Sequence, residues 1–108
     1  MRSMRECRAV FQLVHPFLGT GFEIVDEIYQ FKAWERAKVN VLLSLDTASV
    51  DLKLPTVRRK DGDFALSWWR PYGKGRVFYT ALGHRKDVWL DERFRKHVRG
   101  GLAHVLSR

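Results

Sequence analysis

Two groups of residues have side chains suited to catalysis or ligand binding. His84 follows Leu82-Gly83 at the end of an expected strand, and an imidazole can transfer protons or bind a metal. Asp26 and Glu27 supply carboxylates from another expected strand. An imidazole beside a carboxylate forms an acid/base pair whose proton affinity can be tuned. We therefore predict that His84 faces the same cleft as Asp26 or Glu27.

The strand that positions His84 is expected over Arg76–Ala81. Gly73-Lys74-Gly75 before it predicts a tight turn, since glycine tolerates positive φ. Val77–Thr80 is a run of β-branched and aromatic residues, which favours a central strand covered on both faces. In open α/β sheets, ligands bind at the carboxyl ends of the strands. This rule places His84 where a ligand would bind.

The carboxylates belong to an alternating segment, Phe22–Phe31, which predicts a second strand. Adjacent residues of a regular strand point to opposite faces, so Asp26 and Glu27 cannot share a cleft unless a bulge intervenes. Tyr29 on this strand is expected to pack, with its hydroxyl finding a partner.

The remaining pattern predicts two more strands, a hairpin and one helix. Lys38–Asp46 reads as a strand, and Asp61-Gly62 between Val57–Arg59 and Phe64–Trp69 reads as a hairpin turn. Asp91 can cap a helix over Glu92–Leu106. Its expected apolar stripe is Phe94, Val98, Leu102 and Val105 or Leu106, with Gly100-Gly101 allowing close packing on a sheet. Residues 1–8 show no periodicity and are expected to fray, and 9–14 are expected to form a short strand.

Composition and charge narrow the function classes. No apolar run approaches the roughly 20 residues of a membrane span. One cysteine, Cys7, cannot form an internal disulfide, so the cytoplasm is the expected compartment. The net charge of +8 raises nucleic acid as a partner, but the basic residues are scattered, which favours a solvated surface. Lys74–Tyr79 lacks the alternate aromatics of RNA-recognition strands, because Phe78 and Tyr79 are adjacent. No His, Cys or Asp spacing predicts a metal site, and the sequence identifies no cofactor.

One stretch resembles a known family. Tyr72–His84, followed by Trp89, closely resembles the ThuA-like (trehalose utilisation) family. Further segments agree in order, namely His15-Pro16, residues 22–29, residues 41–46, and residues 93–102 as a closing helix. The resemblance implies an α/β domain over residues 15–108, part of a class I glutamine amidotransferase-like (flavodoxin-like) sheet. The family domain is about twice this length, so we expect the carboxyl-terminal half, preceded by a poorly defined segment over residues 1–14.

The resemblance also implies carbohydrate utilisation, with a sugar or keto-glycoside as the small-molecule partner. Trp68 and Trp69 lie on opposite faces of one expected strand, and either indole is a candidate to stack on a sugar ring, although tryptophan more commonly packs in a core. Tyr29 and Arg70 complete the expected substrate-binding set. The enzyme type, whether hydrolase, lyase or isomerase, stays open, as do nucleic-acid binding and an inactive fragment. An uncovered sheet face would favour self-association. His15 is a weak ligand candidate, and His97 and His104 are expected to be structural or exposed.

Overall fold

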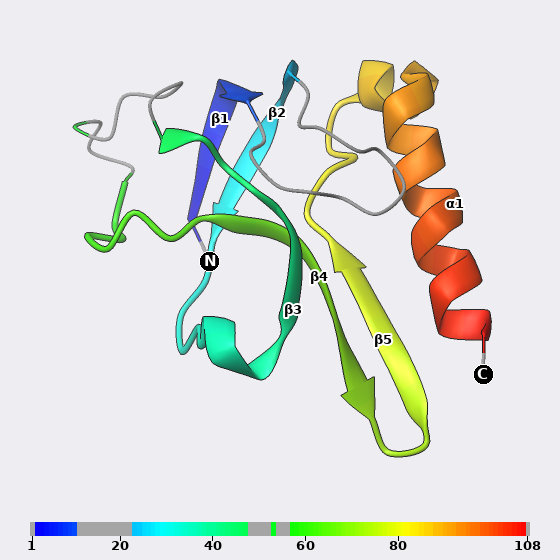
Figure 1. The fold of residues 1–108 in the computed structure, drawn as a ribbon. Helices are drawn as coiled ribbons and strands as arrows, with labels where there is room; N and C mark the ends of the chain where they lie inside the picture. The colour runs from blue at the N-terminus through cyan, green and yellow to red at the C-terminus, as the bar shows by residue number, and fades with distance from the viewer. Residues whose placement is uncertain (1, 11–22, 48–52, 54–56, 108) are drawn as a thin grey trace.

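The computed structural model describes residues 2–10, 23–47, 53 and 57–107. Most of the chain between these segments is drawn in grey in Figure 1. The described elements are β1 (Arg2–Val10), β2 (Glu23–Gln30), η1 (Arg36–Lys38), β3 (Asn40–Ser44), β4 (Ala65–Tyr72), β5 (Gly75–Thr80), η3 (Lys86–Leu90) and α1 (Glu92–Leu106). The chain is therefore a mixed α/β protein with one C-terminal α-helix, as predicted. No described helix is long and apolar enough to cross a membrane.

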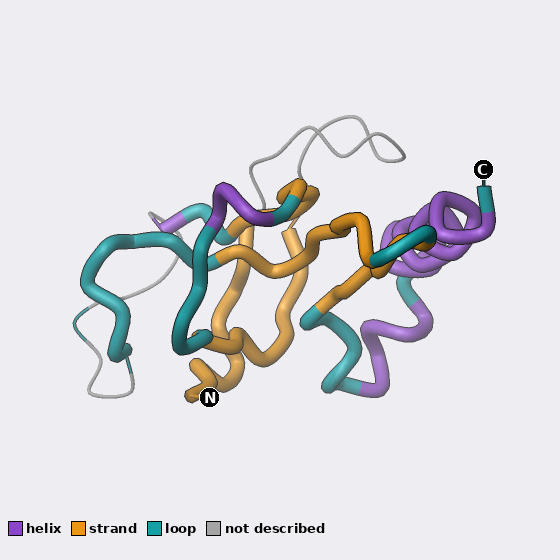
Figure 2. The backbone as a smooth tube through the Cα atoms, turned by 90° about the horizontal axis from the view of Figure 1, so that it is seen from below, coloured by secondary structure: helices purple, strands orange, loops and turns teal. Residues whose placement is uncertain are grey.

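The strands form two separate antiparallel sheets. β1 pairs with β2, and the second sheet has the order β3-β4-β5. Helix α1 lies beside β5, on the side of the molecule away from β1 and β2, in both Figure 1 and Figure 2. Because the described strands pair antiparallel, the rule about strand ends in open α/β sheets does not place His84. Its position depends on specific contacts instead.

The prediction that Val77–Thr80 forms a central strand is wrong. β5 is the last strand of the three-stranded sheet in the described part of the chain, and Val77 is 39% exposed. Apolar residues occupy consecutive positions because both faces of this edge strand have neighbours. Phe78 contacts His97 of α1, whereas Tyr79 stacks on Trp68 of β4.

The hairpin lies at Gly73-Lys74, between β4 and β5. Gly73 has φ +56°, the left-handed conformation that the two glycines predicted. Pro71 lies within β4 and pairs with Arg76. β3 pairs with β4 only up to Trp69, so the missing N–H of Pro71 leaves no ladder bond with β3 unmade.

Two further predictions about strands need correction. Asp61-Gly62 does not connect two strands, because Val57–Arg59 is not a strand: the N–H groups of Arg58 and Arg59 donate to the Gln30 side chain, at 2.6 and 3.1 Å. The aperiodic N-terminal residues belong to β1, where the backbone of β2 supplies the partners. Hydrogen bonds between backbones do not require alternating apolar side chains, so the sequence of these residues does not indicate a strand.

Helix α1 begins and ends as predicted, and Asp91 caps it by accepting from the Arg93 N–H at 2.8 Å. Its buried face differs from the predicted stripe. Phe94 is buried and Val98 packs on the core, but Leu102 and Leu106 are 56% and 72% exposed. The fully buried His97 and the buried Gly101 lie toward the sheet instead.

Bulky side chains on the sheet explain this rotation of α1. The face that meets the helix carries Phe78, against His97, and Trp69, whose ring lies 4.4 Å from that of His104. A Cβ at position 101 would lie 2.4 Å from the Phe78 ring, so only glycine allows the present approach. The predicted close packing of the helix on a sheet is thus confirmed for Gly101.

The hydrophobic core joins the two sheets to the start of α1. It contains residues from β2, β3, β4, the loops, η3 and α1, namely Ile24, Leu43, Leu45, Val57, Phe64, Leu66, Leu82, Val88 and Phe94. Burying one such side chain contributes about 1.5–3 kcal/mol. This cluster lies directly beneath the segment that carries His84, since Leu82 and Val88 flank that segment.

The contact between Gly101 and Phe78 gives the first prediction. Gly101→Ala should lower the free energy of unfolding by about 1–3 kcal/mol, because overpacking outweighs the better helix propensity of alanine. In a Phe78→Ala background the same substitution should be neutral or stabilising. Urea unfolding of the four proteins measures this coupling. An equal cost in both backgrounds would show that the ring does not limit the helix approach.

Candidate functional site

The side chains of His84 and Glu27 are in hydrogen-bonding contact at the turn after β5. His84 Nδ1 lies 2.9 Å from Glu27 Oε2, as the predicted proximity to a carboxylate requires. The two side chains differ in environment, since that of His84 is 56% exposed and that of Glu27 is 8% exposed. The imidazole is therefore available to a ligand while its partner is shielded from water.

Asp26 does not share this role but fixes the backbone of the same turn. Its carboxylate is fully buried and accepts from the N–H groups of Gly83 at 2.7 Å and Arg85 at 3.2 Å. It also accepts from the N–H of Glu27 at 2.8 Å. Gly83 and Arg85 flank His84 on both sides, so Asp26 holds the main chain that presents the imidazole.

The opposite side of the turn is held by Trp89. Its indole Nε1 donates to the Gly83 carbonyl at 2.9 Å. Gly83 has φ +111°, and a Cβ there would lie 3.2 Å from the Trp89 ring and 3.3 Å from that of Phe94. Glycine is thus required both by the backbone conformation and by the close indole.

Both carboxylates reach one turn although they are adjacent on a strand. The turn lies along β2 on the side away from β1, as Figure 1 shows for the segment between β5 and α1. Side chains from either face of β2 can bend toward that edge. The register of β1 also shifts between Met4 and Cys7, opposite Glu27, so the pairing is irregular at this point. The sequence allowed both carboxylates at one site only if a bulge intervened, and the register shift opposite Glu27 is an irregularity of that kind.

The predicted substrate-binding residues do not gather around His84. Trp68 stacks on Tyr79 with ring centroids 4.4 Å apart, and Phe31 and Trp34 lie against Trp68 at 5.1 and 4.7 Å. We call these four residues the aromatic cluster. Burial, and next the neighbouring Tyr29, raise the pKa of the Tyr79 phenol, so Tyr29 of β2 lies near this cluster. Packing inside the cluster occupies the Trp68 ring.

Trp69 and Arg70 lie elsewhere. Trp69 is on the α1 side of the sheet, where its ring contacts His104. The Arg70 guanidinium lies 5.2 Å from the centre of the Tyr72 ring, at the exposed hairpin. The prediction that the two indoles of Trp68 and Trp69 point to opposite faces is confirmed, and this separation prevents them from forming one binding surface.

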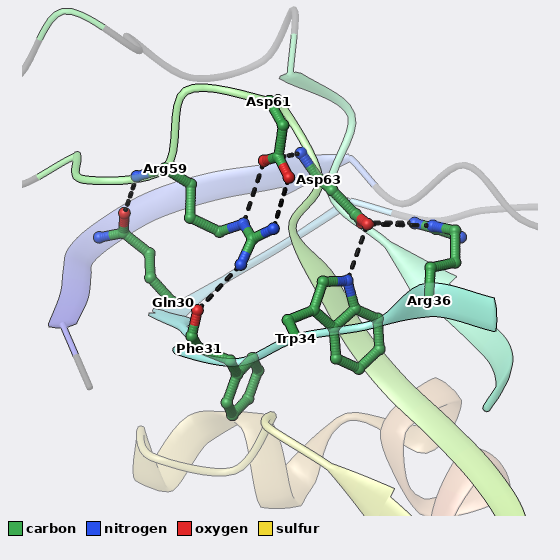
Figure 3. A network of polar contacts seen from close by, with 7 residues as sticks. All are labelled: Gln30, Phe31, Trp34, Arg36, Arg59, Asp61 and Asp63. Atoms are coloured by element: carbon green, nitrogen blue, oxygen red, sulfur yellow. Dashed lines mark hydrogen bonds and ion pairs between the residues drawn. The ribbon is translucent and has the colours of Figure 1, made fainter. Parts of the chain in front are cut away.

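A polar network holds the segment that carries Phe31 and Trp34 (Figure 3). Asp63 accepts from the Trp34 indole at 2.7 Å and from Arg36 Nη2 at 2.7 Å. Arg59 pairs with Asp61 and donates to the Phe31 carbonyl at 2.9 Å. The hydrogen bond from Arg59 lowers the pKa of the Asp61 carboxyl. The loop over residues 58–63 is therefore tied to residues 31–36 by charge.

Comparison with known families identifies the chain. The family model ThuA, described as trehalose utilisation, matches residues 10–105, which is most of the sequence. The chain belongs to the ThuA family. No curated protein and no solved structure matches it.

In this ThuA-family chain, the sequence did not predict the bond that holds the His84 turn, nor the partners of Trp68 in the aromatic cluster. Trp89 was noted as part of the family pattern, but its hydrogen bond to Gly83 depends on the 3-10 turn η3. The sequence has no periodicity that predicts this turn. Nothing in the sequence beyond their aromatic character predicted that Tyr79, Phe31 and Trp34 would contact Trp68. His15, a weak ligand candidate, lies outside the described residues. The described residues contain no group of three or more His, Cys, Asp or Glu able to hold a metal ion.

The buried carboxylate of Asp26 gives the second prediction. Asp26→Asn should lower the free energy of unfolding by about 2–5 kcal/mol, because an amide replaces one acceptor oxygen by a donor that faces backbone N–H groups. The matched control is Asp87→Asn, which removes a carboxylate paired with Arg85 on the surface and should change stability by about 0.5 kcal/mol or less. Chemical denaturation of both variants decides; equal effects would contradict the role of Asp26.

The third prediction concerns pH and Asp63. Burial raises the pKa of its carboxyl, but hydrogen bonds from Arg36 and Trp34 outweigh burial, so the pKa lies below its usual value of 3.8. The unfolded chain then binds a proton more readily, and stability falls as pH drops below the unfolded pKa and through the lower folded pKa. Asp63→Asn should be less stable than the parent at pH 6, and this difference should shrink toward pH 3. Urea unfolding at both pH values tests this; a difference independent of pH would contradict it.

Proposed function

We propose that this ThuA-family domain transforms a sugar derivative by using His84 as a general acid/base, with Glu27 as its partner. The observation that carries the proposal is the 2.9 Å contact between a half-exposed imidazole and a nearly buried carboxylate. Family membership supports carbohydrate as the substrate class. Asp26 acts as a positioning residue in this proposal, because it contacts the backbone and not the imidazole.

The contact with Glu27 determines which nitrogen of His84 would react. An ionised carboxylate only accepts hydrogen bonds, so the proton between the two groups belongs to Nδ1. Nε2 of the neutral ring then carries the lone pair, and it makes no hydrogen bond within the described part of the chain. Removal of a substrate proton by Nε2 creates an imidazolium, which the Glu27 carboxylate stabilises.

This proton transfer suits the keto-glycosides that the family resemblance implies. A proton on the carbon next to a ketone is acidic enough for an imidazole base to remove, and the same nitrogen can return it to the leaving oxygen or to a neighbouring carbon. Lyase and isomerase reactions of such sugars share this step. The proposal therefore names the proton transfer and the substrate class.

Two related proposals concern the fold and the rival function. We propose that residues 15–108 form the carboxyl-terminal half of a class I glutamine amidotransferase-like domain. The packing does not favour RNA recognition: Phe78 lies under α1, where a Cβ at Gly101 would touch it, whereas Tyr79 stacks on Trp68. The adjacent aromatics thus face opposite sides, and neither forms an open platform with the other.

The fourth prediction tests the acid/base pair. The purified chain is incubated with disaccharides and their keto derivatives, and products are followed by NMR. His84→Ala should reduce turnover by about 10²–10⁴-fold, the usual contribution of a general acid/base. It should leave the thermal midpoint nearly unchanged, because the side chain is largely exposed. Glu27→Gln should reduce turnover by a smaller factor.

The control for this experiment is Lys86→Ala, an exposed substitution two residues from His84. It should retain full turnover. Activity that persists in His84→Ala, even if only part of that variant stays folded, would contradict the proposal. It would also fail if the parent chain turns over none of these sugars.

A further inference from the structure

A cavity lies at the opposite end of β5 from His84. It has a volume of about 850 Å³ and opens between the β4–β5 hairpin and the last turn of α1. β5 runs from Gly75 at this cavity to Thr80 near the His84 turn, a separation of about 17 Å at the usual rise per residue. The cavity is therefore distinct from the proposed acid/base site. We call it the hairpin groove.

The walls of the hairpin groove are largely apolar. Trp69 and Pro71 of β4 form one side, and Val105 and Leu106 of α1 form the other. Leu106 is 72% exposed, so its side chain is accessible to a ligand in the groove. Small-molecule sites of 300–1,000 Å³ are commonly lined in this way, with a few polar groups that fix the ligand.

The polar groups of the groove carry positive charge. Lys74, at the tip of the hairpin, is exposed and makes no ion pair with another described residue. Arg76 is half-buried, and the residues that line the groove include no carboxylate. A ligand in this groove would therefore meet two cations and no acidic side chain.

Arg76 is fixed before any ligand binds. Its Nη1 donates to the carbonyl oxygen of His104 in the last turn of α1, at 2.9 Å, and to that of the capping residue Ser107, at 3.3 Å. Nε and Nη2 make no hydrogen bond within the described part of the chain, so they remain available. The guanidinium also lies 6.0 Å from the centre of the Trp69 ring. A positioned cation beside an aromatic wall loses little side-chain entropy on binding.

We propose that the hairpin groove binds a small organic anion that contains a ring. The ring lies against Trp69, Pro71 and Leu106, and a phosphate, sulfate or carboxylate group accepts hydrogen bonds from Lys74 and Arg76. Arg76 suits this task because its planar guanidinium offers several donors to one anionic group. The site does not involve His84, so its occupancy is independent of the proposed sugar chemistry.

The test uses four probes that separate charge from ring type. Phenyl phosphate and glucose 6-phosphate carry the charge on an aromatic and a sugar ring, and phenol and glucose are their neutral counterparts. Titrations followed by ¹H–¹⁵N NMR should show that an anionic probe binds at least tenfold more tightly than its neutral counterpart. Shifts should centre on residues 69–76 and 104–107. Equal binding of charged and neutral probes, or shifts centred on residues 82–87, would overturn the proposal.

A pair of charge reversals controls for general electrostatics. Lys74→Glu should weaken binding of the anionic probe at least tenfold, whereas Lys60→Glu, the same change on an exposed loop outside the groove, should alter it less than twofold. Both lysines are exposed, so both variants should fold. Equal weakening by the two reversals would show that only net charge attracts the anion.

Discussion

The rest of the site depends on the hydrogen bonds that the buried carboxylate of Asp26 accepts from the turn after β5. Strand pairing does not connect the β1–β2 sheet to the β3–β4–β5 sheet, so packing and side-chain contacts must join them. Asp26 lies in the first sheet and accepts from Gly83 and Arg85, which follow the second. A buried charge without partners is strongly unfavourable, which makes these hydrogen bonds obligatory and fixes the turn relative to β2.

Two adjacent carboxylates consequently have different tasks. Asp26 is fully buried and bonds to backbone, whereas Glu27 reaches the imidazole of His84. The shorter aspartate side chain suits close contact with N–H groups, and the longer glutamate side chain extends past the backbone to the ring. The sequence presented the two residues as equivalent candidates, and the contacts that each makes at the turn separate their roles.

Local patterns in the sequence predicted the elements that depend on neighbouring residues alone, such as caps, turns and periodic segments. Helix α1 was predicted from its cap and periodicity, and β5 from its glycine turn and aromatic content. The rotation of α1 was not predictable from the helix alone, because Phe78 of β5 demands a small residue at Gly101. The Asp61-Gly62 turn misled for a similar reason, since the preceding N–H groups bond to Gln30, 28 residues away. The proximity of His84 to a carboxylate was predicted, but the turn that creates it depends on Trp89 and Asp26, which are remote from each other in the chain.

The distribution of charge explains why a basic chain need not bind a polyanion. Four arginines have an aspartate beside them: Arg36 with Asp63, Arg59 with Asp61, Arg85 with Asp87 and Arg93 with Asp91. Exposed pairs of this kind add little stability, but they cancel the local field. Excess positive charge then remains where no carboxylate is adjacent, as at Lys74 and Arg76 on the hairpin. Two cations in one groove match the charge of a single phosphate group, whereas a nucleic-acid backbone requires many such contacts along an extended surface.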